Sequence, residues 1–461
     1  MRIRADLTDE IVEGLQRIRQ QFKVPADFPE DVLQAAEAAA KRAPTAHVDR
    51  TDWPFVTLDP AESTDLDQAF HIEMAGNDVL LHYAIADVAW FVDDGDPIDN
   101  EAWQRGETLY LPDGKAGLYP PSLAEGAASL LPDGVRPAVV FHVRVAAQGQ
   151  SKLDGVTRST IRSRAKLAYE TVKPSDLPGA FPELARRIAL AEDARGAARV
   201  ESVEQVVRVT ENGGYDISFR PRLQSEGDNA AMSLATNLAI ADLLFATGTG
   251  LFRVMPDPDE RIERRLRHTA RALGIEWDAK TSLRDFERTL DGKTPKSAAM
   301  QMAVRRAGGS ASYVPFVAGE RPWHSAMAAT YAHGTAPLRR LADRNVVMAA
   351  LAIANGQPVP EQIASAFQKL PDVMKHADDT DRQIERAVIE LAEVALLSSQ
   401  RQRTFSAVVT DVDDRGARIQ LCDLPVVARV DAHNVAPGDD LRVRAVTADI
   451  PSRTLKLERV A

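Results

Sequence analysis

The chain has 461 residues, of which 44% are apolar and 27% charged, a composition typical of a globular protein with a large core and one or two small domains. Its net charge of −11 argues against a protein that coats nucleic acid with its whole surface, although a local basic channel is compatible with it. No apolar run approaches the roughly 20 residues that span a bilayer, and no apolar signal-peptide core follows Met1. The single cysteine, Cys422, excludes an intramolecular disulfide and fits a reducing cytoplasm, so we expect a cytoplasmic protein without a membrane partner.

Two amphipathic segments begin the chain. Residues 8–21 place Ile11, Leu15 and Ile18 on one face, and residues 30–43 repeat the pattern, which predicts two short helices. Two such helices suit either half of a helix-turn-helix contact with nucleic acid or a brace against the next domain. We favour the brace.

Strand-like and helix-like patterns divide the middle of the chain. Between residues 50 and 170, apolar runs of strand length alternate with turns that contain Pro and Gly. Helical periodicity follows, so we expect an α+β body with a mixed sheet and helices. The segments predicted as helices are 181–200, 228–247, 258–273, 296–308, 336–354, 360–370 and 380–403.

The pattern changes again after residue 403. Five short apolar runs are separated by turns such as Pro437-Gly438-Asp439, which predicts a small β-barrel of the OB type over residues 403–461. The runs lack the surface aromatic residues on which bases stack, so a nucleic-acid contact there would be mainly electrostatic. The predicted strands are 405–409, 417–421, 426–430, 441–446 and 454–457.

An acidic segment, residues 59–70, lies between two strand-like runs. Asp59 follows an apolar run, and Asp65 and Asp67 would share one face of an extended chain. Such carboxylates repel one another without a cation, and oxygen ligands suit Mg²⁺ or Mn²⁺. The segment therefore predicts a metal site, with an acidic surface turn as the alternative.

The acidic segment resembles the signature D-P-x-x-x-x-D-[IL]-D-D-A of the ribonuclease II/R family, whose members carry the RNB catalytic domain. Later segments resemble other motifs of this family in the same order along the chain. Several ordered matches support the resemblance more strongly than one motif does. The later matches are YAIADVA at 83–89, RGETLYLP at 105–112, SLLP at 129–132, RAKLAYE at 164–170, YAHGTAPLRRLAD at 331–343 and DRQIERAV at 381–388.

The resemblance implies an RNB catalytic domain over residues 49–400 and an S1 domain over residues 403–461, preceded by the helical segment 1–48. It also implies a monomeric, processive 3′-to-5′ hydrolytic exoribonuclease that binds the 3′ ends of single-stranded RNA, uses Mg²⁺ or Mn²⁺, and releases nucleoside 5′-monophosphates. Residues 1–48 leave no room for the two cold-shock domains typical of the family. We therefore hypothesise an open channel entrance that tolerates duplex RNA beside a 3′ overhang.

The resemblance also assigns roles to residues that match the family's motifs. Asp59, Asp65 and Asp67 fall on acidic residues that bind or orient Mg²⁺, and Asp67 falls on the aspartate that acts most directly in catalysis. Arg339 falls on the arginine that contacts the scissile phosphate, where a guanidinium suits a shifting oxyanion charge. Arg340 would support the backbone nearby and the contact with RNA.

Three further matched residues concern RNA. Tyr110 falls on a tyrosine that packs against bases in the channel, and Tyr169 falls on one that positions the 3′-terminal nucleotide. Glu385 falls on a glutamate near the ribose, although it could equally pair with Arg382 or Arg386. Basic side chains that could line a channel, or equally a solvated surface, are Arg158, Arg162, Arg164, Lys166, Arg220, Arg222, Arg261, Arg264, Arg265, Arg267, Arg305, Arg306, Arg339, Arg340 and Arg344.

Departures from the family pattern affect the same site. Gln68 replaces a fourth aspartate and keeps only a carbonyl oxygen for a metal, so the metal affinity and the number of metals are open. Ala230 and Ala231 replace an acidic pair, and Val206 replaces an aromatic residue. Two rival functions follow: a catalytically weakened RNA-binding member of the family, or a different metal-dependent phosphodiesterase that acts on DNA or small nucleotides.

Overall fold

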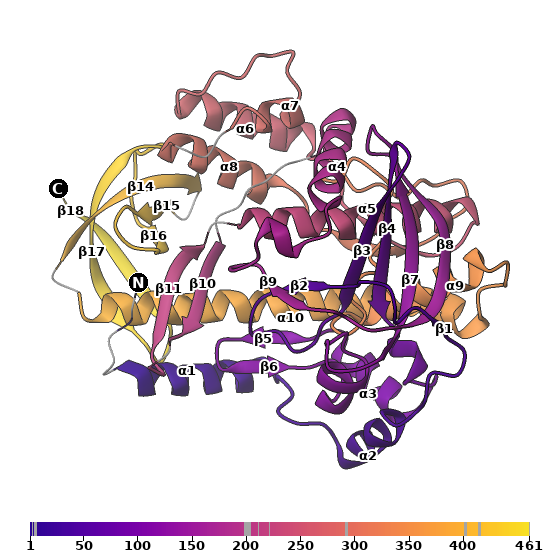
Figure 1. Cartoon of the computed structure of the whole chain (residues 1–461). Helices are drawn as coiled ribbons and strands as arrows, with labels where there is room; N and C mark the ends of the chain where they lie inside the picture. Colours follow the sequence, from indigo (N-terminus) through magenta and orange to yellow (C-terminus); the bar gives the residue numbers. More distant parts are fainter. Residues whose placement is uncertain are drawn as a thin grey trace.

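The computed structural model describes residues 1, 3, 7–197, 204–210, 212–220, 222–290, 294–400, 403–413 and 416–460. Figure 1 shows a sheet covered by helices at one end, a β-barrel at the other, and the long helix α10 running between them. The helices are α1 (Thr8–Gln21), α2 (Glu30–Ala39), α3 (Pro97–Arg105), α4 (Phe181–Arg195), α5 (Gln224–Ala246), α6 (Glu260–Ala272), α7 (Leu283–Glu287), α8 (Pro295–Ala307), α9 (Leu341–Ala354) and α10 (Glu361–Ser398).

The central sheet has the strand order β1-β8-β7-β4-β3, in which only β1 joins its neighbour in parallel. Helices α4, α5 and α9 pack on it, and their apolar side chains form one continuous core with those of the strands. This mixed arrangement confirms the expected α+β body. The strands before the barrel are β1 (Val48–Asp49), β2 (Thr57–Asp59), β3 (Gln68–Ala75), β4 (Asp78–Ala86), β5 (Leu109–Leu111), β6 (Gly114–Ala116), β7 (Arg136–Val145), β8 (Ser151–Ile161), β9 (Lys166–Ala168), β10 (Glu204–Val209), β11 (Tyr215–Arg220), β12 (Leu251–Val254) and β13 (Ser312–Pro315).

Helix α5 corrects the expectation about apolar runs. Among the described residues it is the one helix whose length and mean hydropathy, 1.3, would by themselves allow it to cross a membrane. Of the window that meets this criterion, 61% is buried inside the protein, because α5 packs against the sheet, α4 and α9. Its apolar composition is therefore explained by the core.

Several helix predictions were wrong at their ends, among them 181–200, whose helix α4 ends at Arg195. Helix α9 begins at Leu341 and not at 336, because residues 337–339 form a turn and Arg340 has an extended backbone (φ −134°, ψ 122°). The predicted helices 360–370 and 380–403 form one helix, α10, which continues through Pro371. Proline removes a backbone donor, but α10 packs on α1, α9 and β13, and this burial outweighs the local cost.

The first two helices brace different parts of the molecule. Ile11, Leu15 and Ile18 of α1 share an apolar cluster with α10, and α1 runs alongside α10 in Figure 1. Ala36 of α2 belongs instead to the core of the sheet. Helix α2 ends at Ala39, before the predicted end at 43. Because the two helices pack on separate cores, the structure favours the brace over a helix-turn-helix.

The C-terminal barrel has the five strands that the sequence predicts. They close in the order β14-β15-β16-β18-β17, and the barrel interior shares the apolar cluster of α1 and α10. Helices α6, α7 and α8 form a separate small cluster around Leu266, Phe286 and Met300, and α8 contacts β14. The barrel strands are β14 (Thr404–Asp413), β15 (Gly416–Leu421), β16 (Val427–Val430), β17 (Asp440–Asp449) and β18 (Thr454–Val460).

Candidate active site

Two short strands bring Asp59 and Tyr169 together. Strands β2 and β9 pair in parallel with Asp59 opposite Ala168, and the Tyr169 N–H donates to the Asp59 carbonyl oxygen at 3.1 Å. Burial raises the pKa of Asp59 to about 6, and the charge of Asp65 acts in the same direction, against the opposing effect of Arg339. The Asp59 carboxyl group is therefore short of positive partners.

Asp67 lies directly before β3 and is only 5% exposed. The Leu338 N–H donates to Oδ1 at 2.7 Å, and Nε of Arg339 lies 3.3 Å from Oδ2. Burial nevertheless raises the pKa of Asp67 to about 7, because these two contacts compensate the buried charge incompletely. A cation next to Asp67 would supply what is missing.

Asp65 has protein partners for its charge. Nζ of Lys115 lies 3.0 Å from Oδ1, and the Tyr110 hydroxyl donates to Oδ2 at 3.3 Å. Both partners come from the β5–β6 hairpin. The Tyr110 side chain is 51% exposed, so the structure places its ring at the rim of the site, over Asp65.

The side chain of Gln68 is engaged at both ends. Its Nε2 donates to the Thr335 carbonyl oxygen at 2.6 Å, and its Oε1 accepts from the Tyr83 hydroxyl at 2.7 Å. That hydroxyl also lies 2.8 Å from Oγ of Ser233. Gln68 therefore links β3 to β4, α5 and the loop that carries Arg339.

The loop that carries Arg339, residues 334–340, is fixed by a buried ion pair. Oδ2 of Asp343 accepts from the N–H groups of Thr335 and Ala336 at 3.1 and 2.9 Å. The Arg340 guanidinium binds the same carboxylate with two hydrogen bonds of 3.0 and 2.7 Å. Arg340 is thus tied through Asp343 to the backbone of the loop, whereas the Arg339 side chain is 46% exposed.

Helix α5 contributes three polar side chains spaced by four residues, Asn229, Ser233 and Asn237. Asn229 donates to the Tyr169 hydroxyl at 2.7 Å, and Asn237 Oδ1 accepts from the Gly334 N–H at 2.9 Å. Sequence reasoning missed all three. Their spacing was the available signal, because residues four apart share one helix face.

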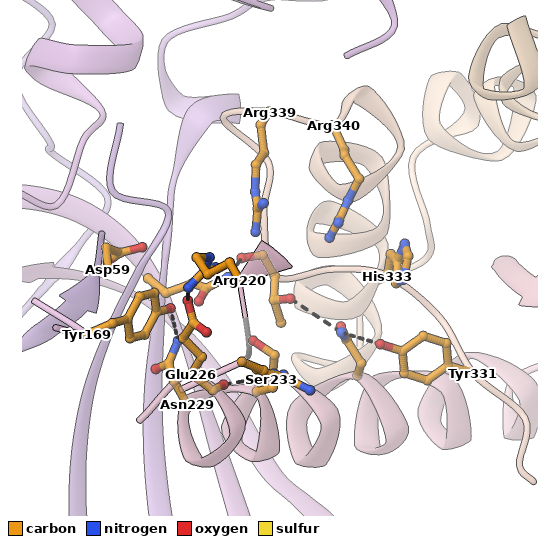
Figure 2. Close-up of a pocket in the computed structure, with 15 residues that line it drawn as sticks. Asp59, Tyr169, Arg220, Glu226, Asn229, Ser233, Tyr331, His333, Arg339 and Arg340 are labelled. Carbon is orange, nitrogen blue, oxygen red and sulfur yellow. Dashed lines mark hydrogen bonds and ion pairs between the residues drawn. The ribbon is translucent and has the colours of Figure 1, made fainter. Parts of the chain in front are cut away.

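Some of these side chains line a cavity of about 460 Å³, whereas Asp65, Asp67 and Tyr110 are not part of its lining. In Figure 2, Arg339 and Arg340 extend side by side from their loop toward α5, with Asp59 and Tyr169 at one end of the cavity. On the same wall, Arg220 pairs with Glu226 at 2.7 Å. The lining consists of Asp59, Gln68, Tyr169, Arg220, Arg222, Glu226, Asn229, Ala230, Ser233, Asn237, Tyr331, His333, Thr335, Arg339 and Arg340.

Glu385 lies elsewhere. It lines a second cavity, of about 530 Å³, between α10 and the barrel, together with Arg382 and Arg386. Val206 pairs with Ser218 in the β10–β11 hairpin and does not line the first cavity. Glu385 therefore lines a different cavity from Asp59 and Arg339.

Several of the basic residues proposed for a channel have structural roles. Arg344 forms a buried ion pair with Asp99, and Arg158 binds Asp87 at 2.6 Å. The side chains of Arg305 and Arg306 lie outside the described residues. The basic side chains that line the active-site cavity are Arg220, Arg222, Arg339 and Arg340.

The acids of the site fit a hard divalent cation that a substrate helps to bind. In the described part of the chain, no group of three or more His, Cys, Asp or Glu side chains is arranged to hold a metal ion. Asp59 and Asp67 are acids whose pKa values burial raises, whereas Asp65 and Gln68 are engaged with protein partners. Mg²⁺ is commonly held by one or two carboxylates plus substrate phosphates. The residues fit that arrangement better than the four-residue cage expected from the sequence.

Known protein families match both the body of the chain and its C-terminal barrel. The RNB domain matches residues 47–353, and the RNase II-type exonuclease C-terminal S1 domain matches residues 403–460. Ribonuclease R of Thermotoga maritima is 27% identical over 436 residues, which cover 88% of this chain and 61% of that protein. Exoribonuclease 2 of Serratia proteamaculans is 26% identical, with 93% and 69% covered. The chain spans 54% of the length of ribonuclease R 1 of Lactococcus lactis.

Solved structures share the fold. RNase R of Mycoplasma genitalium, in complex with ribose-methylated single-stranded RNA, superposes with a TM-score of 0.87 at 20% identity, covering 98% of this chain and 78% of that one. Yeast Ssd1, described as a pseudonuclease, gives 0.69 at 16% identity, covering 91% and 55%. Since the RNB model spans more than half of the sequence and the barrel matches the S1 domain that accompanies it, this chain belongs to the RNB-domain family.

Proposed function

We propose that the protein is a Mg²⁺-dependent exoribonuclease, with Mn²⁺ as a substitute, that hydrolyses RNA processively from the 3′ end to nucleoside 5′-monophosphates. The observation that carries the proposal is the buried, undercompensated carboxylate of Asp67 facing the half-exposed guanidinium of Arg339 at 3.3 Å. The names of the relatives, ribonuclease R and exoribonuclease 2, support it. We also propose a cytoplasmic monomer.

Arg339 is suited to bind the scissile phosphate. Its guanidinium can form two parallel hydrogen bonds to phosphate oxygens, and its loop is already ordered, so little reorganisation is needed during the reaction. When Arg339 turns toward the phosphate, Asp67 is left to bind a cation together with Asp59. A bound Mg²⁺ would neutralise phosphate charge and activate the attacking water.

Tyr169 is suited to hold the 3′-terminal nucleotide. Asn229 donates to its hydroxyl at 2.7 Å, so the orientation of the ring is fixed before RNA enters. A fixed ring can stack on any base, which fits an enzyme that removes nucleotides without regard to sequence. Tyr110, at the rim, is placed to stack on a base further from the 3′ end.

The test compares 5′-labelled single-stranded RNA and DNA of one sequence with Mg²⁺, Mn²⁺ or EDTA. We expect RNA alone to be shortened to small labelled oligonucleotides, with release of nucleoside 5′-monophosphates. EDTA and Asp67→Asn should abolish the reaction, because both remove the cation from the phosphate. Asp94→Asn, at an exposed position, is the matched control and should retain full activity. Equal degradation of DNA would instead favour the other class of phosphodiesterase.

A catalytically weakened RNA-binding protein is the second candidate. Two observations favour it: Gln68 stands in the acidic segment, and the fold is shared with Ssd1, which is described as a pseudonuclease. Retarded migration of RNA without any cleavage in Mg²⁺ or Mn²⁺ would establish this alternative.

We further propose that the protein degrades duplex RNA that carries a 3′ overhang. RNase R of Mycoplasma genitalium, solved in complex with double-stranded RNA, has the same fold with a TM-score of 0.84. A duplex with a single-stranded 3′ tail should be degraded through the junction. Products that end several nucleotides before the junction would contradict this.

A further inference from the structure

We infer that Gln68 is a positioning residue that fixes the Arg339 loop, and that the cation is held without it. The inference rests on the proposed function, because Arg339 matters only if a phosphate binds. It concerns the position in which this chain departs from the four-aspartate signature. Because a glutamine side chain can donate hydrogen bonds and a carboxylate cannot, this departure also changes the hydrogen bonds to the Arg339 loop.

The hydrogen bonds determine the orientation of the Gln68 amide. The Thr335 carbonyl oxygen can only accept, so the side-chain atom 2.6 Å from it must be the Nε2 donor. Oε1 then faces the Tyr83 hydroxyl, which can donate to it at 2.7 Å. Both ends of the amide have complementary partners, and no other orientation satisfies them.

An aspartate could not make this connection. A carboxylate only accepts hydrogen bonds, so at this position it would face the Thr335 carbonyl oxygen without a proton between the two atoms. Both oxygens would lose a partner in a partly buried site, which costs more than a missing exposed bond. The longer side chain and the N–H₂ group of Gln68 are therefore what tie β3 to the loop.

Gln68 acts together with its neighbour Asp67. Asp67 accepts from the Leu338 N–H at 2.7 Å, and Gln68 donates to the Thr335 carbonyl oxygen, so two consecutive residues at the start of β3, Asp67 just before the strand and Gln68 as its first residue, hold the loop at two points. Arg339 directly follows Leu338, the second of these two points. The pair of contacts sets the separation between the Asp67 carboxylate and the Arg339 guanidinium, which the proposed reaction requires to be fixed.

The test uses Gln68→Met, which keeps the length of the side chain but can neither donate to Thr335 nor bind Mg²⁺ through oxygen. We expect kcat for RNA to fall roughly 10- to 100-fold, because a small displacement of a phosphate-binding group has an effect of this size. The Mg²⁺ dissociation constant, measured by calorimetry, should stay unchanged. Amide hydrogen exchange in residues 334–340 should become faster. Gln34→Met, on the exposed side of α2, is the control and should change none of these.

Two further variants test the hydrogen-bond donor of Gln68 and the Tyr83 hydroxyl that orients it. Gln68→Glu keeps the length but removes the donor, so it should accelerate exchange in the loop as Gln68→Met does. Tyr83→Phe removes the hydroxyl that orients Gln68, and its effect on exchange should not add to that of Gln68→Met, because both act through one connection. Additive effects would count against the inference.

The inference is overturned if Gln68→Met weakens Mg²⁺ binding while hydrogen exchange in the loop stays slow. It is also overturned if Gln68→Glu raises the activity with an unchanged loop, or if no variant alters the loop. Calorimetry and hydrogen exchange do not require catalysis. A protein that fails to degrade RNA would therefore refute the proposed function while these two measurements still decide the role of Gln68.

Discussion

Two buried aspartates on either side of the Arg339 loop show how one fold uses the same side chain in two ways. Asp67 is 5% exposed and Asp343 is 0% exposed, and both accept hydrogen bonds from backbone N–H groups of the loop. Burial raises the pKa of Asp67 to about 7. For Asp343, burial acts in the same direction, but the charge and hydrogen bonds of Arg340 outweigh it, so its pKa lies below the usual value.

The difference comes from the paired arginines. Arg340 binds Asp343 with two hydrogen bonds, whereas Arg339 lies 3.3 Å from Asp67 and is about half exposed. A fully compensated acid stabilises the loop, and an incompletely compensated acid retains affinity for a cation. We therefore expect the Arg340–Asp343 pair to matter mainly for stability and the Arg339–Asp67 pair to matter mainly for activity.

The largest effect should come from replacing each of the two arginines by alanine in turn. Arg340→Ala leaves Asp343 as an unpaired buried charge, which should cost ~3–5 kcal/mol in the free energy of unfolding, measured by denaturant titration. Arg339→Ala should leave that free energy within ~1 kcal/mol of the wild type and lower kcat/KM for RNA by roughly 10²- to 10³-fold. If Arg339→Ala destabilised the protein as much as Arg340→Ala, the division of roles would be wrong.

A smaller effect concerns pH in the absence of metal. Because the folded pKa of Asp67 is raised from 3.8 to about 7, the stability it contributes is present at low pH and is lost as the pH rises through 7. In EDTA, Asp67→Asn should therefore melt at a higher temperature than the wild type at pH 8, and the gap should narrow toward pH 5. Mg²⁺ should raise the melting temperature of the wild type more than that of the variant. A gap that does not change with pH would show that Asp67 is compensated as Asp343 is.

The smallest effect should come from Glu385→Gln. Glu385 lines the second cavity, with Arg382 and Arg386, and not the cavity lined by Asp59 and Arg339. We expect the rate of degradation of single-stranded RNA to change by no more than about twofold, equivalent to ~0.5 kcal/mol. If Glu385→Gln lowered the rate of RNA degradation as much as Arg339→Ala does, the two cavities would have to belong to one functional site.

Local patterns predicted most of the secondary structure and failed where packing acted against them. The barrel strands and the helices around residues 181–200 and 228–247 follow from periodicity and turn residues. The predicted helix 360–370 ended just before Pro371, yet α10 passes through it, because Leu370 and Met374 on either side of the proline both pack in the core of the sheet. The turn before Leu341 looked helical, and hydrogen bonds to Asp343 hold it in another form.

For the candidate site, too, the sequence identified some of the residues and missed others. The residue types alone drew attention to the acidic segment, and the resemblance to the family's motifs added Arg339 and Tyr169 as candidates. It could not identify Asn229 as the partner of Tyr169, because the two residues lie 60 positions apart along the chain and meet only in the folded protein.

By itself, the sequence determined the family and the residue types at the site, since both depend on order and spacing along the chain. Only the tertiary structure decided what each acid does. The partners of Asp67 and Gln68 lie 271 and 267 residues further along the chain. Burial and hydrogen bonding by such distant groups set the pKa of Asp67 and turn Gln68 into a donor to the loop, and neither can be read from the acidic segment itself.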